Sequence, residues 1–399
     1  MGDKITRDNI SNSFSTISQK FSSNNFNNYL IFSLIIIVLI VVLLFSWFYK
    51  TLGLKEESCK KLDIIYQNNS FQTKSFIMNN NISATKDNNS KNYFDNEYEC
   101  LLKNYYIKTA YNCCCGDGYK NNFVSECALI KCINLGARCL DFEIYSYNGE
   151  PIVAASTANN NSIKETFNYL KLSDVFDILN SQAFSDIHTS CFNDPMFLHF
   201  RIMSENKTIY DKIGTYIKEN LDKDNRYLLD ENKYNYLHIQ SDRLLTKHIV
   251  SYDIKKKFII MVNTKNNNLM DNSKLKKYVN IRSGSKNMKL LRYENVVAMG
   301  NNNPVLIDDS KTSLIMVLPD LNNRLENHDP ILPQVNGCQF IAMKFQNLDN
   351  NLYSYLKQFK DYGNFSFILK PNTLRLDENE PIQSREPSNL NNQNGHGSI

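Results

Sequence analysis

Two acidic residues stand two positions apart in the segment GARCLDFEIYSYNGEPIVAAS, residues 136–156. Side chains with this spacing on a strand point to the same face, so the carboxylates of Asp141 and Glu143 would lie next to one another on one face of the sheet. Paired carboxylates can hold a divalent cation or exchange protons with a substrate. The next strand, however, ends in Ala155 and Ser156, whose side chains carry no ionisable group. The segment therefore predicts either an active site or a site that keeps the strands but lacks the reactive groups.

A second apolar run, MFLHFRIM at residues 196–203, carries His199 and Arg201 with the same spacing. Imidazole titrates near neutral pH, which makes His199 a candidate relocated base. A hydrogen-bonded core histidine is the commoner outcome in so apolar a strand. His328, in the loop ENHDP, and His396, in the C-terminal tail, are predicted to be solvated.

Strand-like and helix-like runs alternate from about residue 98 onward and must position these side chains. RCLDFEIYSY and EPIVAAS read as strands joined at Asn148-Gly149, a pair that favours a tight hairpin turn. In LSDVFDILNSQAF the apolar residues recur at helical spacing, and Ser173 is predicted to cap the helix. Repeated alternation of strand and helix indicates an α/β class, and the length of the chain suits a β/α barrel.

Residues 29–50, YLIFSLIIIVLIVVLLFSWFYK, are apolar on every face. Roughly 20 such residues are enough to cross a bilayer, and Trp47 and Tyr49 would lie at an interface. We therefore predict a single-pass membrane protein with one transmembrane helix at 29–50. The flanking segments are predicted to be a disordered polar tail at 1–28 and an Asn-rich stalk at 51–97.

The side of the membrane that the large domain faces stays open at this stage. Lys50, Lys55, Lys60 and Lys61 follow the apolar run, which weakly favours a cytosolic domain. The opening residues MGDKIT fit the short pattern for N-myristoylation, which would place the N-terminus in the cytosol.

Ten cysteines and a net charge of +4 restrict the function only in part. The spacing of Cys127, Cys132 and Cys139 is not that of paired zinc ligands, and disulfides and buried thiols are equally compatible with the sequence. The positive charge is spread over the chain, which gives no support for nucleic acid as a partner. The 42% hydrophobic content is sufficient for a sizeable core.

The second half of the chain resembles the Y region of eukaryotic phosphoinositide-specific phospholipase C. The resemblance rests on an ordered series of short motifs: Asn336, Gly337, Cys338 and Gln339, then Phe345-Gln346, then Leu369-Lys370-Pro371, then Leu374-Arg375. The first half resembles the X region of that family through YNCCCGD at 111–117, GARCLDFEIY at 136–145 and GEPIV at 149–153.

The resemblance implies a distorted TIM-like barrel made of two halves. We expect an X-like half at 98–263, a charged insert at 264–287, a Y-like half at 288–377 and a disordered tail at 378–399. Members of this family cleave a phosphodiester bond of inositol phospholipids with two histidines and Ca²⁺.

The motif positions of the family can be matched to this chain one by one. The first histidine position is Tyr111 and the second is Ala155, while Asn112, Asp141 and Glu143 fall on metal-ligand positions. A third carboxylate position holds Arg201. The substrate-contacting cations of the family would fall near Met261, Asn263 and Met316.

These replacements predict a barrel that has lost its chemistry. Tyrosine is no phosphate-binding cation, alanine cannot transfer a proton, and Arg201 would place positive charge where a metal should bind. We therefore expect a membrane-tethered pseudoenzyme without a cofactor, which acts as an interaction or structural module with an unknown protein partner. Two alternatives stay open: a Ca²⁺-dependent phosphoric diester hydrolase with rearranged residues, and a phosphoinositide headgroup binder without turnover.

Overall fold

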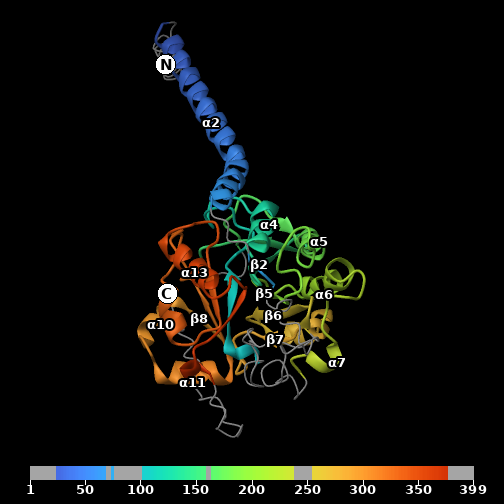
Figure 1. Ribbon diagram of the computed structural model, residues 1–399. Helices are drawn as coiled ribbons and strands as arrows, with labels where there is room; N and C mark the ends of the chain where they lie inside the picture. Colours follow the sequence, from blue (N-terminus) through green and yellow to red (C-terminus); the bar gives the residue numbers. More distant parts are fainter. Residues whose placement is uncertain (1–23, 69–72, 76–100, 159–162, 238–253, 376–399) are drawn as a thin grey trace, which may run out of the picture. The chain divides into compact units, whose positions relative to one another are not determined.

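The computed structural model describes residues 24–68, 73–75, 101–158, 163–237 and 254–375 (Figure 1). The chain divides into two compact units, Met1–Glu56 and Glu57–Ile399. Predictions for other residues, including the disorder of the C-terminal tail and of most of the N-terminal tail, lie outside the described residues.

The long helix α2 spans Asn24–Asn68. It contains one stretch that is long and apolar enough, by length and composition, to cross a membrane, and the large apolar side chains of this stretch are exposed. The helix differs from the predicted boundaries at both ends, because it begins inside the predicted tail and continues through the first part of the predicted stalk. A run of residues without Gly or Pro after Gly53 lets the backbone stay helical there.

Eight parallel strands form a nearly closed barrel in the order β7-β6-β5-β2-β1-β10-β9-β8. Their bounds are β1 Tyr105–Ala110, β2 Cys139–Tyr147, β5 Met196–Ile202, β6 Phe258–Thr264, β7 Ile281–Arg282, β8 Met288–Arg292, β9 Leu314–Leu318 and β10 Phe340–Met343. Three further strands extend this sheet: β3 Glu150–Ala154, β4 Leu170–Lys171 and β11 Phe367–Leu369. The ladder is not closed between β7 and β8.

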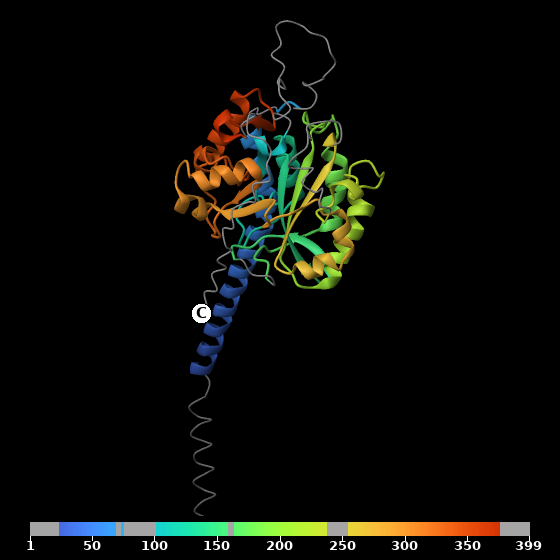
Figure 2. The same cartoon turned by 90° about the horizontal axis from the view of Figure 1, so that it is seen from below.

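Helices lie around the outside of the barrel (Figure 2). The α-helices of the barrel unit are α4 Glu126–Asn134, α5 Leu172–Gln182, α6 Lys207–Tyr216, α7 Glu231–Tyr234, α9 Asn267–Asp271, α10 Tyr293–Met299, α11 Pro304–Thr312, α12 Ile331–Val335 and α13 Asn350–Asp361. Shorter helical turns are η2 Leu102–Asn104, η3 Ile217–Leu221, η6 Lys274–Tyr278 and η7 Asn372–Leu374.

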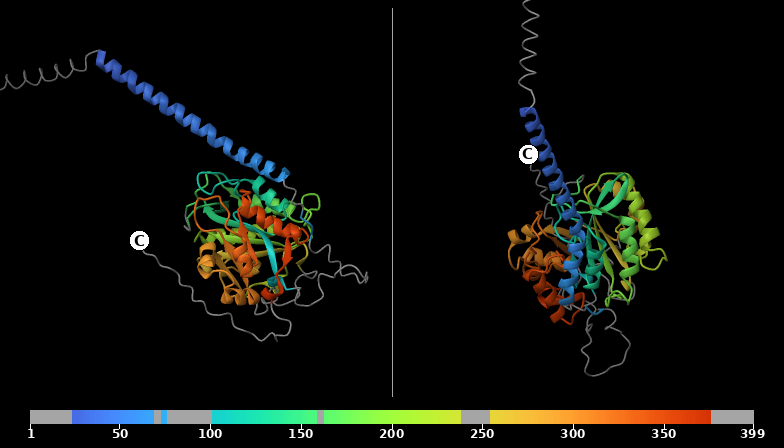
Figure 3. Two further views of the ribbon diagram at one scale, coloured as in Figure 1. Left: turned by 60° about the vertical axis from the view of Figure 1, so that its left-hand side comes forward. Right: turned by 90° about the horizontal axis from the view of Figure 1, so that it is seen from above.

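The two halves of the sequence occupy opposite sides of the barrel. In Figure 2 the helices of the first half, coloured green and yellow, cover one side, and those of the second half, coloured orange and red, cover the other. The right-hand view in Figure 3 shows the same division. An α/β barrel with this arrangement confirms the predicted fold class.

The helix α13 illustrates how the sequence determines its local structure. Asp349 caps its first turn by accepting a hydrogen bond from the backbone N–H of Leu352. The buried side chains Leu352, Tyr355, Leu356 and Phe359 recur at the spacing of one helical face. The hairpin turn predicted at Asn148-Gly149 is also confirmed, since both residues have positive φ and join the antiparallel strands β2 and β3.

Two expectations about local structure require correction. The helix α5 is preceded by Lys171 at its N-cap, and the Ser173 hydroxyl donates to the carboxylate of Asp174 instead of capping the helix. The segment predicted as a charged insert at 264–287 supplies the barrel strand β7. Sequence patterns missed this strand because it has only two residues, too few to show any periodicity.

Part of the predicted stalk belongs to the barrel unit. Leu62 is buried, and Cys59 forms a disulfide with Cys127 at the start of α4. Farther along, Thr73 and Ser75 are also buried, and the Ser75 hydroxyl donates to the carboxylate of Asp194 over 2.7 Å. This segment is therefore part of the folded unit and not only a spacer.

Candidate functional site

The register of β2 and β5 brings the predicted site residues together. Asp141 lies beside His199 in the ladder, and Glu143 lies beside Arg201. Because alternate residues of a strand share a face, all four side chains point into the same end of the barrel. Active sites of β/α barrels lie at this carboxyl-terminal end of the strands.

Arg201 lies between the two carboxylates and is bonded to both. Its Nε and Nη2 donate to Asp141 over 2.9 and 2.7 Å, and its Nη1 donates to Glu143 over 2.7 Å. A further bond of 2.8 Å runs from Nη2 to the side-chain oxygen of Asn112. Arg201, Asp141 and Glu143 are each 3% exposed or less, so this ion-pair network is shielded from water.

Each of the four carboxylate oxygens accepts two hydrogen bonds. Besides Arg201, Asp141 accepts from His199 Nδ1 and from the backbone N–H of Asn112. Glu143 accepts from the side chain of Asn112 and, at its other oxygen, from the Tyr145 hydroxyl and the backbone N–H of Ser156. The lone pairs that a metal would need are thus already in use.

Tyr111 covers the guanidinium group from one side. Its ring centroid lies 4.9 Å from Arg201 Cζ, and its ring packs edge-on against Tyr119 at 5.6 Å. An aromatic face is attractive for a guanidinium cation, whereas a protonated histidine at position 111 would repel it. The replacements at positions 111 and 201 are therefore compatible with one another.

His199 has both ring nitrogens engaged within the protein. Nδ1 lies 2.8 Å from Asp141 and Nε2 lies 3.0 Å from the Ser283 hydroxyl, and the side chain is fully buried. Burial lowers the pKa of His199 despite the neighbouring carboxylate. The neutral ring then donates a hydrogen bond from Nδ1 to Asp141 and accepts one from the Ser283 hydroxyl at Nε2. This geometry gives it no free nitrogen for a substrate.

The charges of the network fix its protonation state. Burial alone would raise the pKa of Asp141, but the charge of Arg201 and the hydrogen bonds from His199 and Arg201 hold that pKa well below its usual range. Burial would likewise lower the pKa of Arg201, and the carboxylate of Asp141 outweighs it so that the pKa lies well above its usual range. Asp141 and Arg201 therefore both stay charged across the physiological range.

The remaining predicted positions offer no reactive group at the carboxyl-terminal end of the barrel strands, which we call the mouth. Ala155 is fully buried directly after β3. Met261 and Met316 are buried in β6 and β9, and the Asn263 side chain donates to the backbone oxygen of Ser283 over 3.3 Å. These residues are positioned in the barrel wall and do not supply cations.

Three contributors to the network were not predicted from the sequence. Tyr145 could have been found, because it lies two residues after Glu143 on the same strand. Ser156 contributes a backbone group, and Ser283 follows the short strand β7, so no side-chain pattern identifies either of them.

His328 also differs from its prediction. Its two ring nitrogens are buried without a hydrogen-bond partner, and the ring stacks on Tyr293 with centroids 4.6 Å apart. Burial lowers the pKa of His328 to about 3, so it is neutral at physiological pH. It is therefore not the solvated loop residue that the sequence suggested.

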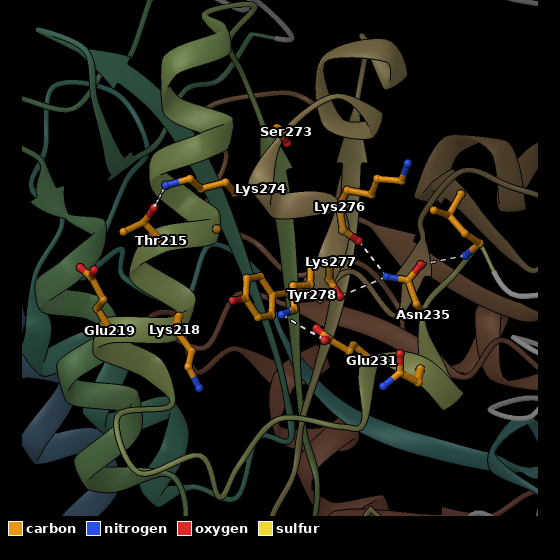
Figure 4. A pocket seen from close by; sticks show the side chains of 13 residues that line it. Thr215, Lys218, Glu219, Glu231, Asn235, Ser273, Lys274, Lys276, Lys277 and Tyr278 are labelled. Carbon is orange, nitrogen blue, oxygen red and sulfur yellow. Dashed lines mark hydrogen bonds and ion pairs between the residues drawn. The ribbon is translucent and has the colours of Figure 1, made fainter.

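Several pockets among the described residues lie away from this network. One, of about 630 Å³, is lined by α6, η3, α7 and η6 (Figure 4). Lys277 pairs with Glu231 there at 3.0 Å, and the Lys274 ammonium donates to the Thr215 hydroxyl at 3.5 Å. The ammonium group of Lys276 points away from that of Lys218, so the lysines do not converge on one anion.

Among the described residues, no group of three or more His, Cys, Asp or Glu side chains is arranged to hold a metal ion. The donor set at the mouth gives the physical reason: a guanidinium group already occupies the space between the carboxylates. The residues present do not fit Ca²⁺.

Comparison with known proteins supports the fold. No protein-family model matches the chain, and no curated protein matches it. Among solved structures, PLC21 of L. pealei and PLC21 of S. officinalis each superpose with a TM-score of 0.51 at 19% sequence identity. Each match covers 69% of this chain and 38% of the other, so this chain spans less than half the length of those proteins.

A calcium-dependent phosphoinositol-specific phospholipase C from a Pseudomonas species is also similar, with a TM-score of 0.41 at 8% identity. That match covers 68% of this chain and 96% of the bacterial one, and its score is too low to carry an argument. Identities this low show a fold and not an activity. The barrel of this chain is a phospholipase C-like barrel.

Proposed function

We propose that this protein is a single-pass membrane protein whose phospholipase C-like barrel no longer catalyses hydrolysis and acts as an interaction or structural module. The observation that carries this proposal is the position of Arg201, bonded to both Asp141 and Glu143 while every oxygen of those carboxylates accepts two hydrogen bonds. Among the described residues, the two carboxylates have no open coordination position and His199 has no free nitrogen.

The membrane anchor of the proposal is α2. Its apolar stretch exposes side chains such as Leu43 and Phe45, which are 67% and 59% accessible to solvent. A soluble protein rarely exposes so long an apolar surface, because contact with water is unfavourable. A bilayer would cover it.

Hydrolysis of phosphatidylinositol bisphosphate in vesicles tests the catalytic part of the proposal. We expect no release of inositol phosphate by the purified protein at any Ca²⁺ concentration, and no heat of Ca²⁺ binding by calorimetry. Release that a chelator abolishes would instead support the alternative of an active hydrolase with rearranged residues.

A headgroup titration separates the other alternative. Binding of inositol trisphosphate without turnover would favour the headgroup binder, and we expect none between the carboxylates because Arg201 is already paired with both. The triple variant Tyr111→His, Ala155→His, Arg201→Glu restores the residue types of the family. Any Ca²⁺-dependent hydrolysis that it gains over the single variant Arg201→Glu would support the loss of activity by replacement.

A further inference from the structure

A disulfide joins the C-terminal part of α2 to the helix α4. Cys59 and Cys127 are bonded with their Cα atoms 6.0 Å apart, and the Ser125 hydroxyl lies within 3.1 Å of the Cys127 sulfur. One helical turn farther along both helices, Asp63 forms an ion pair with Lys131. The matching spacing of four residues on each helix shows that the two helices run side by side, so the disulfide is part of an extended contact.

The other cysteines in the described part of the chain behave differently. Seven are free thiols, and all seven are buried. Burial raises the pKa of six of them, which keeps these thiols protonated and slow to oxidise: Cys113, Cys115, Cys132, Cys139, Cys191 and Cys338. Among the cysteines in the described part of the chain, only Cys59 and Cys127 form a disulfide, and both are half-buried.

We propose that α2 crosses the membrane with its N-terminal end in the cytosol, so that the barrel lies on the extracytoplasmic side. Structural disulfides form and persist in oxidising compartments and are rare in the cytosol. This inference rests on the membrane anchor proposed above. It assigns an orientation that the sequence left open.

The lysines after the apolar run do not outweigh this argument. Two of the four, Lys60 and Lys61, belong to the part of α2 that folds with the barrel unit. Large domains are translocated largely regardless of their flanking charges.

The orientation also bears on the chemistry of the mouth. Phosphoinositides belong to the cytoplasmic leaflet of cell membranes. A barrel on the opposite side has no access to phosphoinositides. Hydrolysis could not occur there, so the replacements at positions 111, 155 and 201 would cost the protein no activity. The partners of the barrel would be extracytoplasmic.

Protease protection of the full-length chain in sealed microsomes tests the orientation. With epitope tags at both ends, we expect the N-terminal tag to be digested and the barrel with the C-terminal tag to be protected until detergent is added. Digestion of the barrel in sealed microsomes would overturn the proposal.

Counting thiols in the same membranes tests the disulfide. Free thiols are blocked under denaturing conditions, and the protein is then reduced and labelled with a polyethylene glycol maleimide. We expect reduction to add two labels in the wild type and in the control variant Cys338→Ala, and none in Cys59→Ser. A wild type without reduction-dependent labels would contradict the proposal.

Carbonate extraction distinguishes failure of the orientation from failure of the membrane anchor. We expect the protein to stay in the membrane pellet. Release into the supernatant would contradict the anchor itself and with it the orientation, whereas a retained protein whose barrel is digested would contradict only the orientation.

Discussion

At the scale of single residues, the barrel mouth is organised by one arginine. Two carboxylates on adjacent positions of one strand face would repel each other when buried, and the guanidinium of Arg201 compensates both. A buried ion pair adds little net stability over a well-packed apolar group, but removal of one partner leaves an uncompensated charge. Catalysis that uses these carboxylates would therefore have to break the ion pairs that hold the mouth together.

Substitution of Arg201 by methionine should destabilise the barrel strongly. The change removes the cation but keeps the apolar stem, so Asp141 and Glu143 are left buried and charged. We expect the free energy of unfolding to fall by about 3–5 kcal/mol, measured by urea denaturation.

Arg226→Met is the matched control for this prediction. Arg226 also pairs with an aspartate, Asp224, but both side chains are more than half exposed. Exposed pairs contribute about 0–1 kcal/mol, so this variant should unfold close to the wild type. Adding Asp141→Asn and Glu143→Gln to Arg201→Met should recover part of the loss. Equal stability of the two arginine variants would contradict the network.

The buried ring nitrogens of His328 should make stability depend on pH. The folded state lowers its pKa to about 3, whereas an unfolded histidine titrates near 6.5. Between these values the unfolded chain binds more protons, so the stabilising contribution is complete above about pH 6.5 and is lost as pH falls toward 3. The linkage slope from this group is at most about 1.4 kcal/mol per pH unit.

The variant His328→Phe keeps an aromatic ring against Tyr293 and has no titrating nitrogen. We expect its unfolding free energy to depend less on pH between 4 and 6 than that of the wild type. His188→Gln, at an exposed position, serves as the control and should leave the slope unchanged. A wild-type slope in His328→Phe would show that other groups cause the pH dependence.

At the scale of elements, the contact between α6 and η6 positions the short strand β7. Gly214 of α6 lies so close to η6 that an added Cβ would lie 2.6 Å from backbone atoms of Lys274 and Leu275. The segment then leads through β7 to Ser283, which hydrogen-bonds His199. Close packing on the outside of the barrel is thus linked to the network at its mouth.

Gly214→Ala should therefore destabilise the protein although alanine favours helix formation. The gain in helix propensity is about 1 kcal/mol, and the steric conflict with backbone should exceed it, for a net loss of about 1–3 kcal/mol. Gly118→Ala is the control, because its nearest neighbouring atom would lie 3.9 Å from the new Cβ. Thermal unfolding of both variants measures the difference. A stabilised Gly214→Ala protein would contradict the described contact.

At the scale of the whole molecule, the sequence predicts the elements that have a periodic pattern of apolar residues. It does not predict features that depend on a single contact between distant segments. Alternation placed Asp141 with Glu143 on one face of their strand and His199 with Arg201 on one face of theirs, whereas the register that brings the two pairs together is seen only in the structure. The strand β7 and the pairing of Cys59 with Cys127 depend on contacts between distant segments, which no local pattern encodes. For the same reason the sequence predicts a stalk at 51–97, although the described residues Leu62, Thr73 and Ser75 are buried in the barrel unit.

Described residues of that segment make buried hydrogen bonds with the barrel. Thr73 is buried, accepts a hydrogen bond of 3.0 Å from the ammonium group of Lys108 and donates one of 3.0 Å to the backbone oxygen of Leu135. Lys108 itself is 1% exposed, and burial lowers its pKa to about 8. A buried amine that loses a hydrogen-bond partner costs about 1–3 kcal/mol, and more when it is charged.

A chain that begins at Leu101 should consequently be less stable than one that begins at Glu57. Urea unfolding of the two chains, both with Cys127→Ser so that the disulfide makes no difference, measures the contribution of residues 57–100. We expect the shorter chain to lose several kcal/mol, of which Thr73→Val in the longer chain should account for about 1–3 kcal/mol by removing the hydroxyl at nearly constant shape. If the two chains unfold at the same urea concentration, residues 57–75 only lie against the barrel. A lower midpoint for the shorter chain would instead mean that residues before Leu101 belong to the folding unit of the barrel, because their removal takes away buried contacts such as the hydrogen bond between Thr73 and Lys108.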